Sequence, residues 1–128
     1  MSATSSAKRS ILVVEDEPSI TNVCQRVLGS EGFEVDIASN GKEAQDMIQE
    51  RRYDYFLFDI KMPILDGKAL YYWLKDKYPQ LAERVMFMTG ESMGVETQSF
   101  LRETGAAFLI KPFTPSELKA KLREFFKY

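Results

Sequence analysis

The sequence predicts an α/β domain of the (βα)5 type, a doubly wound sheet of five parallel strands with helices on both faces. Short apolar runs of strand length alternate along the chain with longer segments whose apolar residues recur at helical spacing. Alternation of this kind is typical of α/β domains with a parallel sheet. The length of 128 residues fits one domain, and 45% hydrophobic residues suffice for a core.

Composition excludes several classes of protein. The net charge of −2 does not indicate a basic, nucleic-acid-binding surface, and no apolar run is long enough to cross a membrane. We therefore expect no direct contact with nucleic acid or with a membrane. A single cysteine, Cys24, excludes an intrachain disulfide and fits a reducing compartment, and the N-terminus lacks the apolar stretch of a signal peptide. We therefore expect a cytoplasmic protein. Since the chain has no histidine, catalysis or metal binding by histidine is excluded.

The first nine residues are small, polar and basic, which predicts a flexible N-terminal tail at 1–9 and a single domain at 10–128. The first strand covers Ser10–Val14. A helix follows from Pro18, a residue suited to a first helical turn, and ends close to Gly32. Its apolar face comprises Ile20, Val23, Cys24, Val27 and Leu28.

The second strand, Phe33–Ala38, alternates apolar and acidic residues, which indicates an edge strand with one buried side. Asn40-Gly41 turns the chain into a second helix, marked by Ala44, Met47 and Ile48. The third strand is the apolar run Tyr55–Phe58, with Asp59 at its end.

A third helix runs from about Asp66 to near Pro79, and Arg84–Met88 forms the fourth strand, ending at Thr89-Gly90. The apolar stripe of the third helix comprises Ala69, Leu70, Trp73 and Leu74.

The fourth helix, Ser92–Thr104, is weakly patterned and is weakened further by Gly94. The fifth strand, Ala106–Ile110, leads into Lys111-Pro112. The last helix begins near Pro115 and buries Leu118, Leu122, Phe125 and Phe126.

Polar residues stand at the ends of four of the five strands. In open sheets of this kind the site lies beyond the carboxyl ends of the strands, so these residues should meet at one edge. They are Glu15-Asp16, Asp59, Thr89 and Lys111. Because aspartate is a poor strand residue and costly to bury, Asp59 is the candidate nucleophile.

Clustered carboxylates require a compensating charge, since a like-charge pair in contact costs about 4 kcal/mol at a protein-like effective dielectric. An all-oxygen ligand set selects a hard cation, for which Mg²⁺ is the best fit. Lys111 then supplies a fixed cation and Thr89 a hydroxyl donor. These groups around a nucleophilic carboxylate can hold a phosphoryl group.

Four segments resemble the receiver domain of two-component response regulators. They are ILVVEDEP (11–18), FLFDIKMPILDG (56–67), MTG (88–90) and FLIKPF (108–113). The resemblance covers about residues 10 to 127 and implies the flavodoxin-like strand order 2-1-3-4-5. The stretch GAAFLIKPF also resembles receivers attached to hybrid sensor kinases, so the chain is a candidate module of such a kinase.

The resemblance also implies a role for individual residues. Asp59 is similar to the phosphorylated aspartate, Lys111 to the phosphate-contacting lysine, and the Lys111-Pro112 bond is expected to be cis. The implied Mg²⁺ ligands are Glu15 through water, Asp16, Asp59 and the carbonyl of Lys61. Thr89 is similar to the switch hydroxyl and Phe108 to the switch aromatic residue.

The implied mechanism starts from a partner histidine kinase or histidine phosphotransfer domain, whose phosphohistidine is attacked by Asp59. Thr89 and Phe108 then remodel the face made by the fourth helix, fifth strand and fifth helix. Candidate partners of that face are a second copy of the chain or a downstream protein. On this hypothesis the chain transfers and loses its own phosphoryl group but is not an enzyme for a separate metabolite.

Other interpretations remain open from the sequence. One is a phosphohydrolase with an aspartyl-phosphate intermediate, which would usually carry a second acid at the position of Lys61. Another is a flavodoxin-like cofactor binder, which would need a phosphate-binding loop after the first strand, where the acidic Glu15-Asp16-Glu17 would repel phosphate. A degenerate receiver acting only by protein contacts is the fourth alternative. Glu15 to Glu17 could also simply favour a helix N-terminus, and Phe108 could be an ordinary core residue.

Overall fold

The computed structural model describes residues 8–90 and 92–126, so most of the predicted tail and the last two residues of the predicted domain lie outside the described part. Five parallel strands form one sheet in the order β2-β1-β3-β4-β5, which confirms the predicted fold class and strand order. The strands are β1 (Ser10–Val14), β2 (Glu34–Ala38), β3 (Tyr55–Asp59), β4 (Val85–Gly90) and β5 (Phe108–Lys111). The helices are α1 (Pro18–Ser30), α2 (Gly41–Glu50), α3 (Gly67–Lys77), α4 (Pro79–Ala82), α5 (Val95–Thr104) and α6 (Pro115–Phe126).

The described chain has one helix more than the five that the sequence predicts. The third helix ends at Lys77, and Pro79 begins the additional one-turn helix α4 instead of terminating α3. A proline cannot donate the next helical hydrogen bond and disfavours helical backbone at the residue before it. Tyr78 accordingly leaves the helical region, with φ −138° and ψ 72°, and serves as the N-cap of the new turn.

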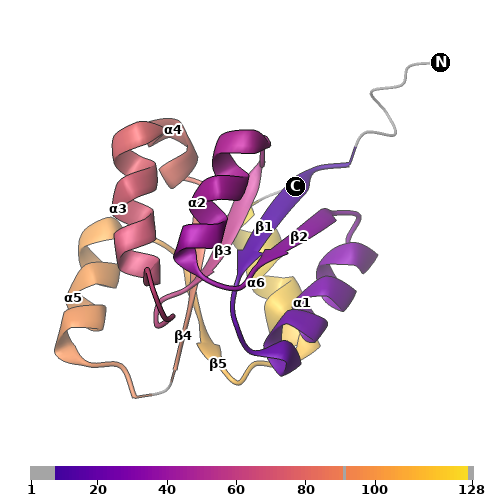
Figure 1. Cartoon of the computed structure of the whole chain (residues 1–128). Helices are drawn as coiled ribbons and strands as arrows, with labels where there is room; N and C mark the ends of the chain where they lie inside the picture. Colours follow the sequence, from indigo (N-terminus) through magenta and orange to yellow (C-terminus); the bar gives the residue numbers. More distant parts are fainter. Residues whose placement is uncertain (1–7, 91, 127–128) are drawn as a thin grey trace.

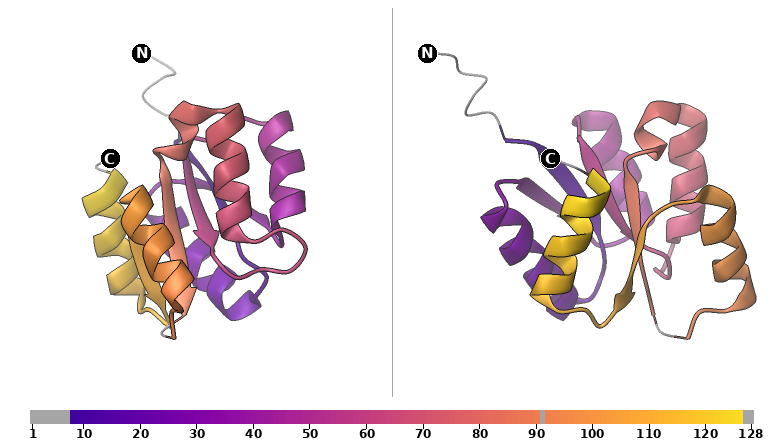
Figure 2. Two further views of the ribbon diagram at one scale, coloured as in Figure 1. Left: turned by 90° about the vertical axis from the view of Figure 1, so that its left-hand side faces the viewer. Right: turned by 180° about the vertical axis from the view of Figure 1, so that it is seen from behind.

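Helices cover both faces of the sheet (Figures 1 and 2). On one face α1 and α6 pack side by side, and they bury a cluster with Cys24, Leu28, Leu118 and Leu122 against β1 and β4. On the other face α2, α3, α4 and α5 bury a larger cluster that is rich in aromatic rings. The three inner strands β1, β3 and β4 therefore lie between two apolar layers, whereas β2 is the half-exposed edge strand that its alternating sequence predicts.

The predicted stripe of α3 is wrong at one position. Ala69 is exposed, and Tyr71 is buried with 7% of its surface accessible. The buried residues Gly67, Leu70, Tyr71 and Leu74 follow the helical spacing of one face. Tyr71 is held there by edge-on contacts with Phe87 and Phe100, each at 5.6 Å between ring centroids.

Several glycine and asparagine residues between the elements lie at the ends of helices. Gly94 is the N-cap of α5 and lies outside the helix, so the prediction that it weakens the helix is wrong. Gly105 ends α5 in the left-handed conformation, φ 67°, which favours glycine. Asn40 caps α2 by accepting a hydrogen bond from the Glu43 backbone N–H at 2.8 Å.

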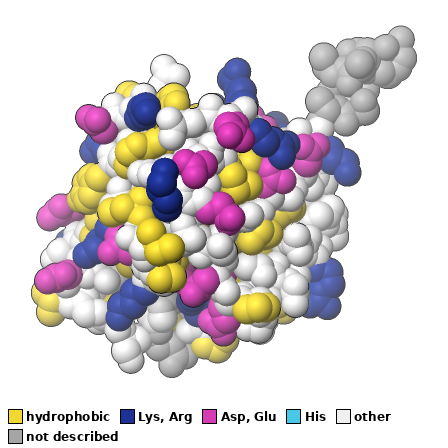
Figure 3. Space-filling model, in the orientation of Figure 1, with side chains coloured by type: hydrophobic (Ala, Val, Ile, Leu, Met, Phe, Trp, Pro, Cys, Tyr) yellow, Lys and Arg dark blue, Asp and Glu magenta, His cyan; other side chains and the backbone are white. Residues whose placement is uncertain are grey.

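The surface carries mixed charges. On the face that shows α2 and α3, hydrophobic side chains are interspersed with acidic and basic ones (Figure 3). The large hydrophobic side chains exposed in the described part are Ile64, Tyr72, Val95 and Ile110. None of the described helices combines the length and the apolar character needed to span a bilayer.

Candidate functional site

The predicted site residues converge where the strands end. Parallel pairing aligns Val14 with Phe58, and Asp59 with Met88, so that β1, β3 and β4 finish together at the lower edge of the sheet in Figure 1. Pairing of Gly90 with Lys111 adds the end of β5. Residues far apart in sequence thus reach one edge because the strands are parallel and in register.

Lys111 connects two buried carboxylates. Its ammonium nitrogen lies 3.1 Å from Oε1 of Glu15 and 3.1 Å from Oδ2 of Asp59. Glu15 exposes 1% of its surface and Asp59 3%, so each would be costly to keep ionised without a partner. The lysine supplies the positive charge that compensates both.

A third carboxylate completes an acidic cluster. Glu15, Asp16 and Asp59 each offer an oxygen, and these oxygens lie within 4.8 Å of one another. Asp16 is exposed, so the cluster opens to solvent on its side. Lys61 lies just after β3 with an exposed side chain, and its backbone N–H is close enough to the Asp59 carboxylate to work against the rise in the pKa of that group.

The electrostatics of the site follow from burial and crowding. Burial raises the pKa of Glu15 to about 7, assisted by the charge of Asp59 and opposed by Lys111. Burial also raises the pKa of Asp59, while Lys111 works against that shift. Burial works to lower the pKa of Lys111, but the two carboxylates outweigh it and hold that pKa above its usual value. One ammonium therefore compensates two crowded acids incompletely, and an additional cation would be stabilised there.

Thr89 lies near the end of β4 and Phe108 at the start of β5, in different surroundings. Thr89 is buried at the end of β4 and lines a cleft of about 310 Å³ between the loops after β4 and β5. The cleft is also lined by Lys61, Gly90, Ser92, Met93, Thr97, Lys111 and Pro112. Sequence reasoning missed Thr97, a buried hydroxyl residue, because nothing in the weak pattern of α5 distinguishes it from a solvent-facing threonine.

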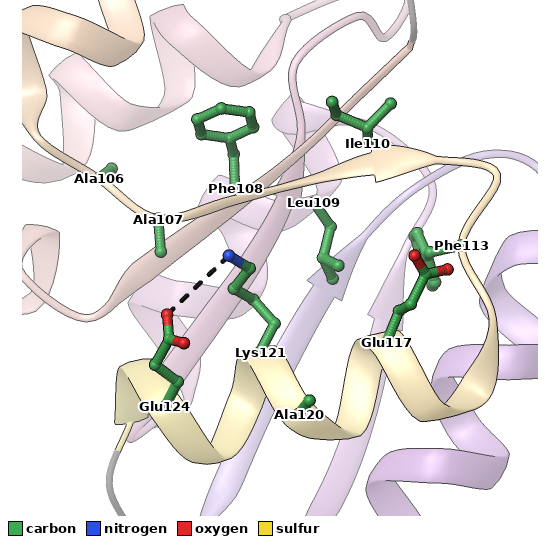
Figure 4. Close-up of a pocket in the computed structure, with 10 residues that line it drawn as sticks. All are labelled: Ala106, Ala107, Phe108, Leu109, Ile110, Phe113, Glu117, Ala120, Lys121 and Glu124. Carbon is green, nitrogen blue, oxygen red and sulfur yellow. Dashed lines mark ion pairs between the residues drawn. The ribbon is translucent and has the colours of Figure 1, made fainter.

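Phe108 is half-buried against the aromatic cluster under α3 and α5. Figure 4 shows its ring pointing away from α6, on the opposite side of β5 from Leu109. Its position is compatible both with a core residue and with a ring that turns. The expected cis peptide is present between Lys111 and Pro112.

The donor set of the cluster fits a hard divalent cation. The three carboxylates supply only oxygen ligands, and the described residues around them include no histidine or thiol ligand. The exposed Asp16 leaves a path for water molecules, which Mg²⁺ retains in most protein sites.

Comparison with known proteins places this geometry in one family. The family model of the response regulator receiver domain matches residues 11–123. The response regulator Rre1 of Synechocystis sp. is 38% identical over 117 residues, which cover 89% of this chain and 50% of that protein. The transcriptional regulatory protein ZraR of Escherichia coli O157:H7 is 36% identical, over 89% of this chain and 25% of that protein.

Solved structures agree. The signal receiver domain of a signal transduction histidine kinase from Syntrophus aciditrophicus superposes with a TM-score of 0.81 at 30% identity, over 94% of this chain and 91% of that one. The receiver domain of the sensor histidine kinase PA1611 from Pseudomonas aeruginosa PAO1 has a TM-score of 0.76 at 27% identity, over 95% and 100%. That structure has a magnesium ion coordinated in its active site cleft.

The chain spans half or less of the length of Rre1 and ZraR, so the match concerns one domain of those proteins. The family model nevertheless covers almost the whole of this chain, and the sheet order agrees with the fold of the solved receivers. The chain therefore belongs to the receiver-domain family of the two-component response regulators.

Proposed function

We propose that Asp59 is the phosphoryl acceptor of this receiver domain, and that the phosphoryl group comes from a phosphohistidine of a histidine kinase or a histidine phosphotransfer domain. The observation that carries the proposal is the Lys111 ammonium, 3.1 Å from the carboxylates of both Glu15 and Asp59. A fixed cation beside a buried carboxylate at a solvent-facing edge is the arrangement that phosphoryl transfer needs.

In the transfer step, an oxygen of Asp59 attacks the phosphorus atom. The new P–O bond forms as the P–N bond to the partner imidazole breaks, and the electron pair of that bond stays on the imidazole nitrogen. Lys111 is within reach of the equatorial oxygens of the phosphoryl group, because it already contacts the attacking carboxylate. The Lys61 backbone N–H lies near the Asp59 carboxylate and would help to orient it.

A bound Mg²⁺ would neutralise charge on the phosphoryl oxygens. Glu15, Asp16, Asp59 and the carbonyl of Lys61 are the groups that would hold it, with Glu15 acting through water. The magnesium ion in the cleft of the PA1611 receiver domain supports this assignment.

The response to phosphorylation would pass through Thr89 and Phe108 to the face formed by α5, β5 and α6. Thr89 borders the cleft beside Lys111, and Phe108 pairs with Phe87 on the neighbouring strand. Beyond Phe108, a groove of about 610 Å³ lies between β5 and α6 (Figure 4). A second copy of the chain or a downstream protein would read the change on this face.

The activity of the whole protein is part of the proposal too. Relatives include response regulators with additional sequence and the receiver of a histidine kinase, so both a stand-alone regulator and a hybrid kinase module fit this chain. In either case we propose that it transfers and releases its own phosphoryl group and acts on no separate metabolite.

The decisive experiment is labelling with acetyl phosphate, with and without Mg²⁺, followed by intact-protein mass spectrometry. We expect Mg²⁺-dependent addition of one phosphoryl group, lost in Asp59→Asn. Asp76→Asn, which changes an exposed carboxylate on α3, is the matched control and should label normally. Labelling of Asp59→Asn equal to the unmodified protein would refute the assignment, and steady turnover of a phosphomonoester would favour a phosphohydrolase instead.

A further inference from the structure

The loop between β3 and α3, residues 60–66, contains a strained turn. The Leu65 backbone N–H donates to the Pro63 carbonyl at 2.8 Å, which closes a γ-turn around Ile64. Ile64 has φ 72° and is the sole non-glycine residue with positive φ in the described chain. A γ-turn of this hand is rare, and a β-branched residue there is strained. The Ile64 side chain is 78% exposed, so its own packing does not hold the turn.

Two buried glycines hold the loop from outside. The Gly67 N–H donates to the Ile60 carbonyl at 2.8 Å, and the Gly41 N–H donates to the Leu65 carbonyl at 3.2 Å. A Cβ on Gly41 would lie 2.3 Å from the Leu65 carbonyl oxygen and 2.8 Å from the Leu65 Cβ. The first residue of α2 therefore touches the loop so closely that only glycine fits.

The position of Gly41 is itself fixed by the cap of its helix. Asn40 accepts the Glu43 backbone N–H at 2.8 Å, and the Glu43 carboxylate accepts the Ser39 N–H at 2.6 Å. This reciprocal arrangement resembles a capping box, which makes a rigid helix start. Because the start of α2 is rigid, the backbone position of Gly41 is fixed, and the conformation of the loop at Leu65 has to fit it.

The other end of the loop lies in the acidic cluster. Residues 59–61 carry the Asp59 carboxylate and the Lys61 backbone N–H, which lies close to it. The Gly67 backbone packs directly against the Asp59 carbonyl, since a Cβ at position 67 would lie 2.3 Å from that oxygen. The loop is therefore held at both ends: the first residue of α3, Gly67, packs next to Asp59, and the first residue of α2, Gly41, packs against Leu65.

We propose that Gly41 is a positioning residue for the divalent-cation site: through the Leu65 carbonyl and the turn at Ile64, it fixes the Asp59–Lys61 backbone against the acidic cluster. This inference rests on the proposed Mg²⁺ site and adds a residue of α2 that is not one of the three carboxylates of the cluster. Groups that orient metal ligands typically contribute tenfold to a hundredfold in affinity.

The test compares two glycine-to-alanine variants at helical positions. Gly41→Ala places a Cβ against Leu65, whereas Gly29→Ala, in α1, places one in open space. Isothermal titration with MgCl₂ should show the dissociation constant raised by about tenfold or more in Gly41→Ala and unchanged in Gly29→Ala. Thermal unfolding of both variants separates stability from affinity. A Gly41→Ala protein that is destabilised but binds Mg²⁺ as tightly as the original would overturn the inference.

A second measurement uses the unmodified protein and decides the matter if Gly41→Ala does not fold. If the loop joins Gly41 to the cation site, binding of Mg²⁺ should alter the surroundings of that contact, shift the amide resonances of Gly41 and Leu65 and leave that of Gly29 in place. Resonances of Gly41 and Leu65 that do not respond to saturating Mg²⁺ would refute the positioning role. Absence of Mg²⁺ binding by the unmodified protein would instead refute the proposed function.

Discussion

Lys111 and Asp59 are 52 positions apart in the sequence, yet the lysine ammonium lies 3.1 Å from the aspartate carboxylate. The same ammonium contacts Glu15, 96 positions away, at the same distance. Both contacts depend on parallel strands whose carboxyl ends coincide. The ends of β1, β3 and β5 are therefore joined by the ion pairs of Lys111 in addition to the hydrogen bonds of the sheet.

Replacing Lys111 by methionine should destabilise the metal-free protein. The change keeps the length of the side chain but leaves two buried carboxylates without a cation, and we expect the free energy of unfolding to fall by about 1–3 kcal/mol. Urea denaturation in the presence of a chelator measures this. Lys121→Met is the control, because its ion pair with Glu124 is long, at 4.0 Å, and open to solvent, with side chains 36% and 77% exposed; its loss should lower the free energy of unfolding by less than about 0.5 kcal/mol.

The same Lys111→Met protein should bind Mg²⁺ more tightly and accept phosphate more slowly. The ammonium and the divalent cation compete for the same carboxylates, while only the ammonium at this position can hold the phosphoryl oxygens from the side of β5. Titration calorimetry and acetyl phosphate labelling report the two effects. Weaker Mg²⁺ binding in the variant would contradict this account of the site.

Thr89→Ala should separate phosphorylation from the response to it. Asp59, Lys111 and the acidic cluster remain, so labelling by acetyl phosphate should persist. The shift of the Phe108 amide resonance on adding beryllofluoride and Mg²⁺ should be strongly reduced, because the hydroxyl beside the cleft is gone. An undiminished Phe108 shift would show that Thr89 is no part of the switch.

Tyr53→Phe should lower the free energy of unfolding by about 1–2 kcal/mol. The Tyr53 hydroxyl donates to the Asp36 carboxylate at 2.6 Å, and its ring is buried beside Phe56. Burial, followed by that hydrogen bond, raises the pKa of the phenol. Tyr72→Phe, at an exposed tyrosine of α3, is the matched control in the same denaturant series. Equal effects of the two changes would mean that the Tyr53 hydrogen bond contributes nothing net.

The Cys24 thiol should resist alkylation in the folded protein. Burial raises the pKa of this thiol to about 12, with a smaller contribution from the charge of Glu15. A raised thiol pKa means that the reactive thiolate is scarce at every pH below that value, so iodoacetamide labelling at pH 8 should be much slower than in urea. Mass spectrometry over time measures both rates. A native rate close to the denatured one would show that the residue is accessible.

Local sequence patterns predicted much of this protein. The apolar runs at Ser10–Val14 and Tyr55–Phe58 are buried on both faces of the sheet, and the alternating segment at Phe33–Ala38 contains the edge strand β2, as those patterns require. Polar residues that follow such strands necessarily lie near one edge of a parallel sheet, which is why Glu15, Asp59 and Lys111 could be grouped without coordinates.

Other features depended on contacts between distant segments. The buried stripe of α3 includes Tyr71 rather than Ala69 because Phe87 and Phe100, on other elements, form its surroundings. Thr97 reaches the cleft because the start of α5 folds beside Thr89 and Lys111. Helical spacing within α3 allows either stripe, and the weak pattern of α5 does not distinguish Thr97, so the choice was made by the neighbouring elements.

The order of the five strands and of the five longer helices along the chain, and the identity of the acidic, hydroxyl and ammonium groups, were determined by the sequence alone, since periodicity and turn chemistry are local properties. Only the tertiary structure decided that one ammonium serves both Glu15 and Asp59, and that α2 contacts the loop after β3 through Gly41. The physical reason is that charge compensation and close packing act over a few ångströms in space, between residues that the sequence places dozens of positions apart.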